Sequence, residues 1–291
     1  MTVALITEAD ANPQESDYLA SELSRDGIEV RRAAGADITS AAADAVILIP
    51  FVSTRVTADV MRRMPELRLI ATRSTGIDHI DLDEAARRGI SVKNVPDYGS
   101  VAVAEHTFAL LLTLTRMQPN LAPGTDLSGK TIGVIGTGVI GRHVMQIAHG
   151  FGMNVLAYDI EQRPGIRYTT LDDLLSQADV LTLHIPAAPQ TRHFINRDRL
   201  ARMKKGVIII NTARGSLIDT RALSEALRTG QVAAAGLDVV EPLSDAEWGT
   251  ALPNTVVTPH IAYNTSEAIR RISGITLGNI RQWLRGHDAR S

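Results

Sequence analysis

The stretch "TIGVIGTGVIGRHVMQIAHGFGMNVLAYD", residues 131–159, decides the fold of this chain. It begins with an apolar run over Ile132–Ile135, passes through the glycine pattern GTGVIG, and continues as a helix-forming segment to about His149. A second apolar run then ends at Asp159. A strand, a glycine-rich turn, a helix and a second strand in this order are typical of dinucleotide-binding domains. The stretch therefore predicts a doubly wound α/β domain that binds a dinucleotide.

The three glycines of the pattern have different tasks in such a domain. Gly136 permits the tight turn, Gly138 lets a pyrophosphate approach the backbone, and Gly141 lets helix and strand pack closely. The helix begins with Val139 and Ile140, and its N-terminus faces the phosphates. We predict that these five residues bind the cofactor; the competing interpretation is that the glycines serve packing alone.

Asp159 predicts which dinucleotide is bound. It follows Gly141 by 18 residues, close to the roughly 20 at which an acidic residue binds the adenosine ribose. A carboxylate there repels the 2′-phosphate of NADP. The predicted cofactor is therefore NAD.

Apolar runs alternate with helical segments along the whole chain, which favours parallel sheets. Before residue 130, strands are expected at Val3–Thr7, Ala45–Ile49, Leu67–Thr72 and Ile90–Pro96, with a helix around Glu15–Arg25. After it, six strands are expected, the number typical of a dinucleotide-binding domain: "TIGVIG", "NVLAYD", "DVLTLHI", "VIIINTA", "AAAGLDVV" and "TVVTPH".

A domain boundary is expected near the helix-forming segment Ser100–Arg116. This segment is apolar nearly all round, as in helices buried between domains or subunits. The stretch "MQPNLAPGTDLSGK" that follows is rich in Pro, Gly and Asn and reads as a linker. A length of 291 residues also fits two domains better than one.

Composition predicts a cytoplasmic protein. Apolar residues make up 44% and charged residues 21%, the net charge is −2, and no long charge block occurs, so neither a nucleic acid nor a membrane is expected as a partner. The chain has no cysteine, and its first ten residues lack the basic and apolar regions of a secretory signal. No apolar run approaches the ~18 residues of a membrane span. No metal site is predicted.

Polar residues follow several predicted strands, at the edge where open α/β sheets bind ligands. His184, Pro186 and Thr191 follow one strand and are expected to line the cofactor site. His184 and His193 are interpreted as lining or surface residues rather than as acid–base groups. Since a histidine can exchange protons near neutral pH, His260, which follows another strand, is the candidate for proton transfer; the alternative is a core or surface histidine.

Thr212, Ala213 and Arg214 follow a further strand. An arginine at the carboxyl end of a parallel strand can hold an anionic substrate through paired hydrogen bonds. The alternative for Arg214 is an ion pair at the surface.

Seven stretches together resemble the D-isomer-specific 2-hydroxyacid dehydrogenase family. They span residues from about 67 to 268 in the family's order: "RSTGIDHIDLDEAARRGI", "NVPDYGSVAVAEHTFALLL", "LSGKTIGVIGTGVIGR", "QADVLTLHIPAAPQTRHFIN", "MKKGVIIINTARGSLID", "AAGLDVVEP" and "LPNTVVTPHIAYNTSEA". "GFGMNVLAYD", "NVPDYG" and "TPHIAYNT" are most similar to the D-lactate dehydrogenase-like branch.

The resemblance implies two doubly wound parallel-sheet domains. A Rossmann NAD domain, residues 98–263, would be inserted into a flavodoxin-like substrate domain of residues 1–97 and 264–291. It also implies a cleft between the domains and a homodimer with Ser100–Arg116 at its interface. The linker from Met117 to Asp126 is shorter than in the family, which puts the usual dimer contacts in question.

The resemblance further implies a reversible hydride transfer between NADH and a small 2-oxo acid of the pyruvate and D-lactate kind. Arg214 would bind the substrate carboxylate, and His260 would donate the proton. Ser74, Thr75 and Gly76 would bind the carboxylate through backbone N–H groups, and Tyr98 would contact substrate. The residues expected near the nicotinamide half of the cofactor are Thr212, Ala213, Asp238, His184 and Pro186.

The pattern leaves more than one candidate for the carboxylate that assists His260. The family usually has a glutamate five residues after the position of Asp238, where this chain has Leu243. Glu241 becomes the partner of His260 if a two-residue deletion aligns its Glu-Pro with the family's. The alternatives are Asp245 or no partner acid.

Several functions compete with the D-lactate-like activity. Glyoxylate or hydroxypyruvate reduction uses the same chemistry on other small oxo acids. A slow or inactive family member would fit the displaced glutamate. A nucleotide-sensing corepressor would bind the cofactor and act through a partner protein. This alternative predicts long extra termini or an interaction cleft. The identity of the 2-hydroxy acid and the physiological direction cannot be read from the sequence.

Overall fold

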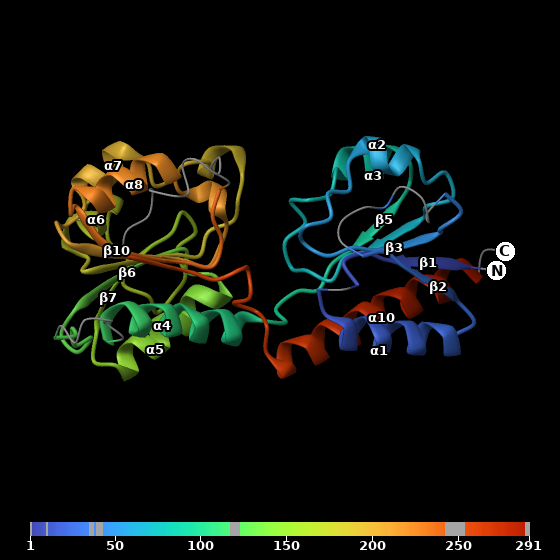
Figure 1. Ribbon diagram of the computed structural model, residues 1–291, viewed down its shortest axis with the longest axis horizontal. Coiled ribbons are helices and arrows are strands. Elements are labelled where there is room, and N and C mark those ends of the chain that lie inside the picture. Colours follow the sequence, from blue (N-terminus) through green and yellow to red (C-terminus); the bar gives the residue numbers. More distant parts are fainter. Residues whose placement is uncertain are drawn as a thin grey trace. The chain divides into compact units, whose positions relative to one another are not determined.

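The computed structural model describes residues 2–9, 11–34, 38, 43–116, 123–241 and 254–288. The chain divides into two compact units, each with its own sheet (Figure 1). Unit 1 consists of Met1–Tyr98 and Thr265–Ser291, and unit 2 of Gly99–Asn264. One unit is therefore built from both ends of the chain and the other from one continuous segment.

Unit 1 has a five-stranded parallel sheet in the order β2-β1-β3-β4-β5, the order of flavodoxin-like folds. Helices α1 and α10 cover one face of the sheet, and α2 and α3 cover the other (Figure 1). Its elements are β1 (Val3–Ile6), α1 (Pro13–Arg25), β2 (Glu29–Arg32), β3 (Ile47–Ile49), α2 (Ala58–Arg62), β4 (Leu69–Ala71), α3 (Leu82–Arg87), β5 (Ser91–Lys93) and α10 (Ser266–Asp288).

The strands of unit 1 are apolar at successive positions because both faces of the sheet are covered. In β1, Leu5 packs in the cluster under α2 and α3, whereas its neighbours Ala4 and Ile6 pack in the cluster under α1 and α10. Leu277 and Ile280 of α10 belong to this second cluster. The C-terminal helix is thus part of the core that the N-terminal strands form.

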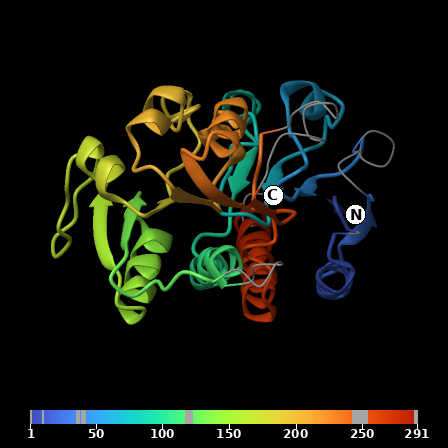
Figure 2. The same cartoon turned by 60° about the vertical axis from the view of Figure 1, so that its left-hand side comes forward.

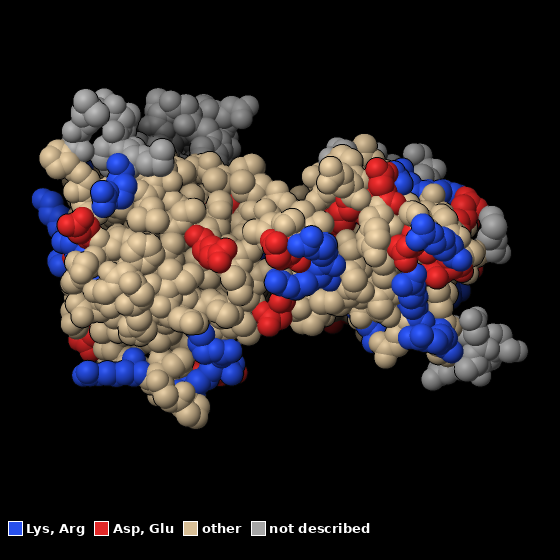
Figure 3. All heavy atoms as spheres, turned by 90° about the horizontal axis from the view of Figure 1, so that it is seen from below, with Lys and Arg blue, Asp and Glu red and all other residues tan. Residues whose placement is uncertain are grey.

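Polar contacts join α10 to the rest of unit 1 as well. Arg281 forms ion pairs with Glu22 (3.0 Å) and Asp26 (2.7 Å) around α1. Arg271 donates to the carbonyl oxygen of Tyr98, and the Asn279 side chain donates to that of Asn94. On the face that carries α1 and α10, basic side chains lie beside acidic ones (Figure 3).

Unit 2 has a six-stranded parallel sheet in the order β11-β10-β9-β8-β6-β7. The strands that follow β6 along the chain, β7 and β8, lie on opposite sides of it, and such a switch point is where open α/β sheets bind ligands. Its elements are α4 (Ser100–Arg116), β6 (Thr131–Ile135), α5 (Val139–Gly150), β7 (Asn154–Tyr158), α6 (Leu171–Gln177), β8 (Val180–Leu183), η1 (Pro189–Thr191), α7 (Arg197–Arg202), β9 (Val207–Asn211), η2 (Gly215–Leu217), α8 (Thr220–Arg228), β10 (Val232–Leu237) and β11 (Thr255–Val257), where η marks a 3₁₀ turn.

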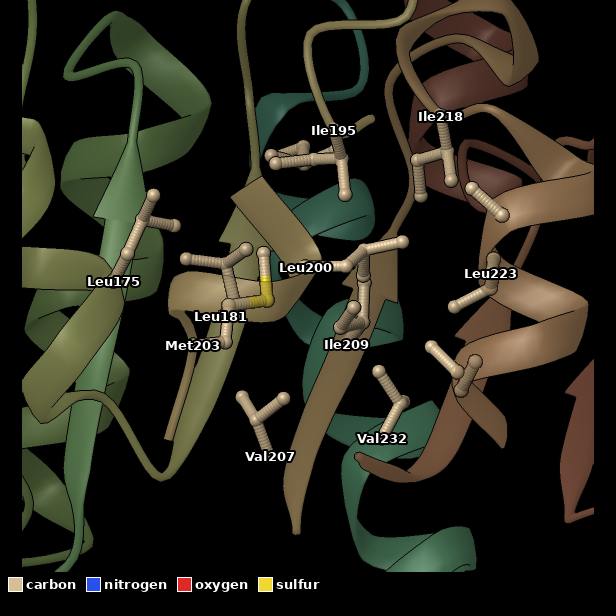
Figure 4. Close-up of a cluster of buried hydrophobic side chains, with 14 of the residues drawn as sticks. Leu175, Leu181, Ile195, Leu200, Met203, Val207, Ile209, Ile218, Leu223 and Val232 are labelled. Atoms are coloured by element: carbon tan, nitrogen blue, oxygen red, sulfur yellow. The ribbon is translucent and has the colours of Figure 1, made fainter. Parts of the chain in front are cut away.

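Helices α6, α7 and α8 cover one face of this sheet. Leu175, Leu200 and Leu223 of the helices meet Leu181 and Ile209 of the strands in a core that is almost fully buried (Figure 4). Full burial of an aliphatic side chain stabilises a fold by about 1.5–3 kcal/mol relative to exposure. This core therefore fixes the strands whose ends carry the predicted site.

Helices α4 and α5 lie together on the opposite face of the sheet (Figures 1 and 2). Phe108 of α4 stacks on Phe151, which follows α5, with ring centroids 5.2 Å apart. Gly236 of β10 leaves no room for a side chain because a Cβ there would lie 2.9 Å from Leu110 of α4. The apolar character of α4 therefore reflects its burial against the sheet of unit 2.

The sequence-based predictions of the fold class and of the six strands of unit 2 are confirmed. In unit 1 the four expected strands are present, and the sheet gains a strand that the sequence analysis did not identify, β2. In the described part of the chain, no helix combines the length and apolar character needed to cross a membrane.

Candidate active site

The glycine-rich turn between β6 and α5 has the shape that its sequence predicts. Gly136 adopts φ +95°, and a Cβ there would lie 2.5 Å from the carbonyl oxygen of His184. A Cβ on Gly141 would overlap the carbonyl oxygen of Gly136. Among the described residues, no group beyond the chain neighbours of Gly138 lies within 4 Å of the position that a Cβ would take there, at the N-cap of α5. The turn is therefore closely packed beneath Gly136 and Gly141 and open at Gly138, as a phosphate-binding turn requires.

The Asp159 carboxylate is bound to this turn. It accepts hydrogen bonds from the backbone N–H (2.6 Å) and hydroxyl (3.0 Å) of Thr137 and from the N–H of Glu161 (3.0 Å). Burial works against ionisation, but these hydrogen bonds hold the pKa of Asp159 below its usual range. The group is an anion at neutral pH, as a ribose-binding carboxylate should be.

Two residues that the sequence analysis did not identify support Asp159. The hydroxyl groups of Thr137 and Tyr168 are hydrogen-bonded at 2.8 Å, and the Tyr168 hydroxyl also accepts from the N–H of Arg163. The variable position inside a GxGxxG pattern gives no sign of such a role. Tyr168 is likewise nine residues away from Asp159 in sequence.

The residues that follow β8 form a compact loop. His184 Nε2 lies 2.9 Å from the Thr182 hydroxyl, and burial lowers the pKa of His184 to about 3. The ring is therefore neutral at physiological pH, which agrees with a lining role. Thr191 donates to the carbonyl oxygen of Pro186 (2.8 Å) and accepts from the N–H of Ala188 (2.8 Å), so its side chain closes this loop.

Arg214 follows β9 in a turn that Asn211 closes. The Asn211 side chain donates to the Arg214 carbonyl oxygen (2.9 Å) and accepts from the N–H of Ala213 (3.0 Å). The Thr212 hydroxyl lies 3.2 Å from that of Thr107 in α4. Asn211 is fully buried, and the sequence analysis treated it only as part of a strand.

Asp238 organises the segment that carries His260. Its carboxylate accepts from the Thr258 hydroxyl (2.6 Å) and from the N–H groups of Ile261 and Ala262 (2.9 Å each). The N–H of His260 donates to the Asp238 carbonyl oxygen (2.9 Å), and His260 adopts φ +56°. Asp238 thus holds the segment of the predicted proton donor, His260. Its contact with the cofactor stays a prediction.

The Glu241 carboxylate contacts His193, whereas the sequence-based expectation was a contact with His260. His193 Nε2 is 2.6 Å from one carboxylate oxygen, and Arg192 Nη2 is 2.6 Å from the other. Among the described residues, His193 and Arg192 are its hydrogen-bonding partners, so the expected pairing of Glu241 with His260 stays a prediction. Asp245 and Leu243 lie outside the described residues.

In unit 1, the predicted carboxylate-binding turn follows β4. The Ser74 hydroxyl donates to the Gly76 carbonyl oxygen (2.7 Å), and the Thr75 hydroxyl donates to that of Val95 (2.8 Å). Tyr98 is buried at the end of the first segment of unit 1. These bonds fix the shape of the turn, and carboxylate binding by its N–H groups stays a prediction.

The carboxyl ends of β8, β9 and β10 and the segment after β11 meet at one edge of the unit 2 sheet. This edge carries His184, Arg214, Asp238 and His260, next to the dinucleotide turn after β6. An arginine and a histidine beside a dinucleotide site can bind an anion and transfer a proton. Among the described residues, no group of three or more His, Asp or Glu is placed to hold a metal ion.

Known proteins match this chain over both units. Residues 101–262 match the family model of the D-isomer specific 2-hydroxyacid dehydrogenase NAD binding domain. The glyoxylate reductase of Thermofilum pendens is 38% identical over 265 residues, which cover 82% of this chain and 78% of that protein. The D-3-phosphoglycerate dehydrogenase of Methanocaldococcus jannaschii is 40% identical over 268 residues, covering 84% of this chain but 51% of that protein. The chain thus spans about half the length of such longer relatives.

A solved structure agrees with the sequence matches. The D-lactate dehydrogenase of Aquifex aeolicus, complexed with NAD and lactic acid, is similar with a TM-score of 0.85 and 36% identity, covering 97% of this chain and 96% of that one. The resemblance inferred from the sequence and the prediction of NAD as the cofactor are therefore confirmed. The chain belongs to the D-isomer-specific 2-hydroxyacid dehydrogenase family.

Proposed function

We propose that this protein is an NAD-dependent dehydrogenase that interconverts a small 2-oxo acid and the corresponding D-2-hydroxy acid. The observation that carries the proposal is the common sheet edge of unit 2. Arg214 and His260 lie there beside a dinucleotide turn whose Asp159 is ionised. A cation for a carboxylate, a proton donor and a cofactor site are what this reaction requires.

Each group has a separate task in the proposed reaction. The Arg214 guanidinium binds the substrate carboxylate through paired hydrogen bonds. In the reductive direction His260 donates a proton to the carbonyl oxygen as that oxygen gains charge, and in the oxidative direction it takes the proton back. Bound NAD supplies the hydride acceptor, and NADH the donor. In unit 1, the N–H groups of Ser74, Thr75 and Gly76 are proposed to bind the carboxylate, and Tyr98 to contact substrate.

The residues around the dinucleotide turn fit NAD. The ionised Asp159 offers acceptors to ribose hydroxyls and repels an added phosphate. The open space at Gly138 and the N-terminus of α5, with Val139 and Ile140, suit a pyrophosphate. His184, Pro186, Thr191, Thr212, Ala213 and Asp238 are proposed to line the remainder of the site.

The substrate is proposed to be pyruvate or a similar small oxo acid. The similarity to a D-lactate dehydrogenase supports this choice, whereas the similarity to a glyoxylate reductase supports glyoxylate or hydroxypyruvate. These acids differ only in the group on the carbonyl carbon, so Arg214 and His260 would act alike on each.

A panel of 2-oxo acids tests the proposal. Purified protein is mixed with NADH or NADPH and with pyruvate, glyoxylate, hydroxypyruvate, phenylpyruvate or a branched 2-oxo acid, and loss of the reduced nicotinamide is followed by absorbance. We expect turnover with NADH and at least one acid. No turnover with any acid would refute the proposal, and tight NADH binding without turnover would favour the nucleotide-sensing alternative. A preference for NADPH would contradict the role of Asp159.

We also propose that the protein forms a homodimer in the cytoplasm. The family resemblance supports the homodimer, and the absence of cysteine suits a reducing compartment. Light scattering coupled to size-exclusion chromatography measures the mass in solution, and a monomer mass of 31.4 kDa would contradict the dimer. Cell fractionation tests the compartment.

A further inference from the structure

Arg192, His193 and Glu241 form a hydrogen-bonded cluster in unit 2 that the proposed reaction does not use. Both carboxylate oxygens of Glu241 are engaged, one by Arg192 and the other by His193. Because the Glu241 carboxylate is the acceptor, His193 Nε2 must donate. We call these three residues the Glu241 clamp.

One side of the clamp is bound to η2 through the main chain. The N–H of His193 donates to the carbonyl oxygen of Ser216 (2.8 Å), and the N–H of Ile195 donates to that of Leu217 (2.8 Å). Ile195 and Ile218 form a parallel bridge there. These main-chain contacts join the loop that carries His193 to η2.

The other side of the clamp packs directly on η2. A Cβ on Gly215 would overlap the carbonyl carbon of Val240 and would lie 2.6 Å from the backbone nitrogen of Glu241. Gly215 is thus in close contact with the segment that follows β10. The turn η2 lies between two segments, and the side chains of Glu241 and His193 tie those segments together.

Arg214 is the N-cap of η2. Its carbonyl oxygen accepts from the N–H of Leu217 (3.2 Å) and from the Asn211 side chain (2.9 Å). The backbone of Arg214 is therefore fixed by η2 on one side and by the end of β9 on the other. A loosened η2 would let Arg214 leave the position in which it binds an anion.

Partial burial strengthens the hydrogen bonds of the Glu241 clamp. The Glu241 side chain is 24% exposed and that of His193 34%, whereas Arg192 is 58% exposed. Hydrogen bonds between charged groups are stronger when water is partly excluded. The bond between Glu241 and His193 should therefore dominate over the outer one to Arg192.

We propose that Glu241 is a positioning residue that acts through His193 and Arg192: the clamp holds η2, and η2 holds Arg214 in place to bind the substrate carboxylate. This role is the alternative to the expected partnership of Glu241 with His260, which stays a prediction. The proposal rests on one part of the proposed function, the binding of the 2-oxo acid by Arg214.

A double-mutant cycle on the full chain tests the proposal. Glu241→Gln, His193→Phe and the double variant are assayed with pyruvate or the best acid of the panel. We expect each single change to raise KM for the oxo acid about tenfold, the size expected when a charge-assisted hydrogen bond is lost. The double variant should be no worse than the worse single one, because Glu241→Gln weakens and His193→Phe removes the same hydrogen bond. KM for NADH and the pH dependence of kcat/KM should stay as in the wild type.

Two further variants separate positioning from general damage. His193→Gln keeps a donor near the position of Nε2 and should restore most of the lost KM. Asp172→Asn removes the exposed ion pair with Arg202 (3.0 Å), elsewhere in unit 2, and should change nothing. Additive effects of Glu241→Gln and His193→Phe would overturn the clamp. A shifted pH profile in Glu241→Gln, with His193→Phe like wild type, would also overturn it and place Glu241 at His260.

Backbone amide exchange gives a readout that needs no substrate. In Glu241→Gln and in His193→Phe, the N–H groups of Leu217 and Ile218 should exchange about tenfold faster than in wild type. Unchanged exchange in both variants would refute the clamp. If the panel shows no turnover, or if Arg214→Leu leaves KM for the oxo acid unchanged, the proposed function fails, and the exchange rates still decide the clamp.

Discussion

At Asp238, one buried carboxylate accepts three hydrogen bonds from residues 258–262, and the main chain of His260 donates to its carbonyl oxygen. These hydrogen bonds join the segment of residues 258–262, which follows β11, to the end of β10. The histidine at their centre adopts a left-handed conformation that a non-glycine residue rarely takes. The cost of that conformation is offset by the hydrogen bonds to Asp238, so the proposed proton donor depends on a residue that need not itself exchange a proton.

Asp238→Asn tests this dependence. The amide nitrogen cannot accept, so at least one of the three donors loses its partner in a buried place. We expect the free energy of unfolding, measured by urea denaturation, to fall by about 1–3 kcal/mol. We also expect kcat to fall because His260 is no longer fixed. Asp172→Asn, at the surface, serves as the control, and a variant with wild-type stability and kcat would contradict the role.

His184, which is half-buried, gives a pH prediction. Its pKa is lowered to about 3 in the folded state, whereas an unfolded histidine has a pKa of about 6.5. Between these values the unfolded chain binds a proton that the folded chain does not, so this group makes the fold less stable as pH falls from about 6.5 toward 3. The slope is on the order of 1 kcal/mol per pH unit. Urea denaturation as a function of pH should show a shallower fall in His184→Gln than in wild type, and equal slopes would contradict the prediction.

Among the elements, the β6–turn–α5 unit shows the closest link between sequence and geometry. At Gly136 and Gly141 a side chain would overlap the neighbouring backbone. At Gly138 the space that a side chain would fill is open. Two of these glycines are thus required by the fold itself, and the third is proposed to make room for the cofactor. The different reasons lead to different expected phenotypes.

Gly141→Ala and Gly138→Ala form a matched pair. A methyl group at position 141 overlaps the Gly136 carbonyl oxygen, so we expect a loss of about 1–3 kcal/mol in unfolding free energy without any cofactor. A methyl group at position 138 would have open space around it in the described part of the chain. Stability should therefore be unchanged, while NADH binding, followed by fluorescence titration, weakens. Equal stability of Gly141→Ala and wild type would contradict the packing argument.

Other elements show what the sequence could not reveal. The four inner strands of unit 2, β6, β8, β9 and β10, were predictable because they are buried on both faces and hence almost continuously apolar. Strand β2 reads EVRR and is half-buried at the edge of its sheet, so its strand character comes from pairing with β1 rather than from apolar side chains. Likewise, the contact of Glu241 with His193 joins residues 48 positions apart. Such a pairing follows from how two loops pack, which no local pattern records.

For the whole molecule, the decisive feature is that unit 1 contains both ends of the chain. Helix α10 follows all of unit 2 in the sequence yet contributes to the core that the first strands build. The resemblance to the family implied this arrangement, and the apolar spacing of the last helix alone did not. A helix pattern identifies a buried face without identifying what it is buried against.

Ile280→Ala tests how far α10 supports unit 1. Ile280 is fully buried, so the smaller side chain should lower unfolding free energy by about 2–5 kcal/mol. Because the contacts of Ile280 lie in unit 1, amide exchange should increase in β1 and β4 and stay unchanged in β8 and β9. Faster exchange of the unit 2 strands to the same extent would show that the two units unfold together.

The position of α10 also sets an order of events during protein synthesis. Unit 2 is one continuous segment, so it can fold as soon as its last strand has left the ribosome. The sheet of unit 1 emerges earlier, but one of its faces stays without α10 while the whole of unit 2 is translated. During that time Leu19, Leu23 and their neighbours lack part of their cover and offer an apolar surface to chaperones. The domain that is begun first is therefore completed last.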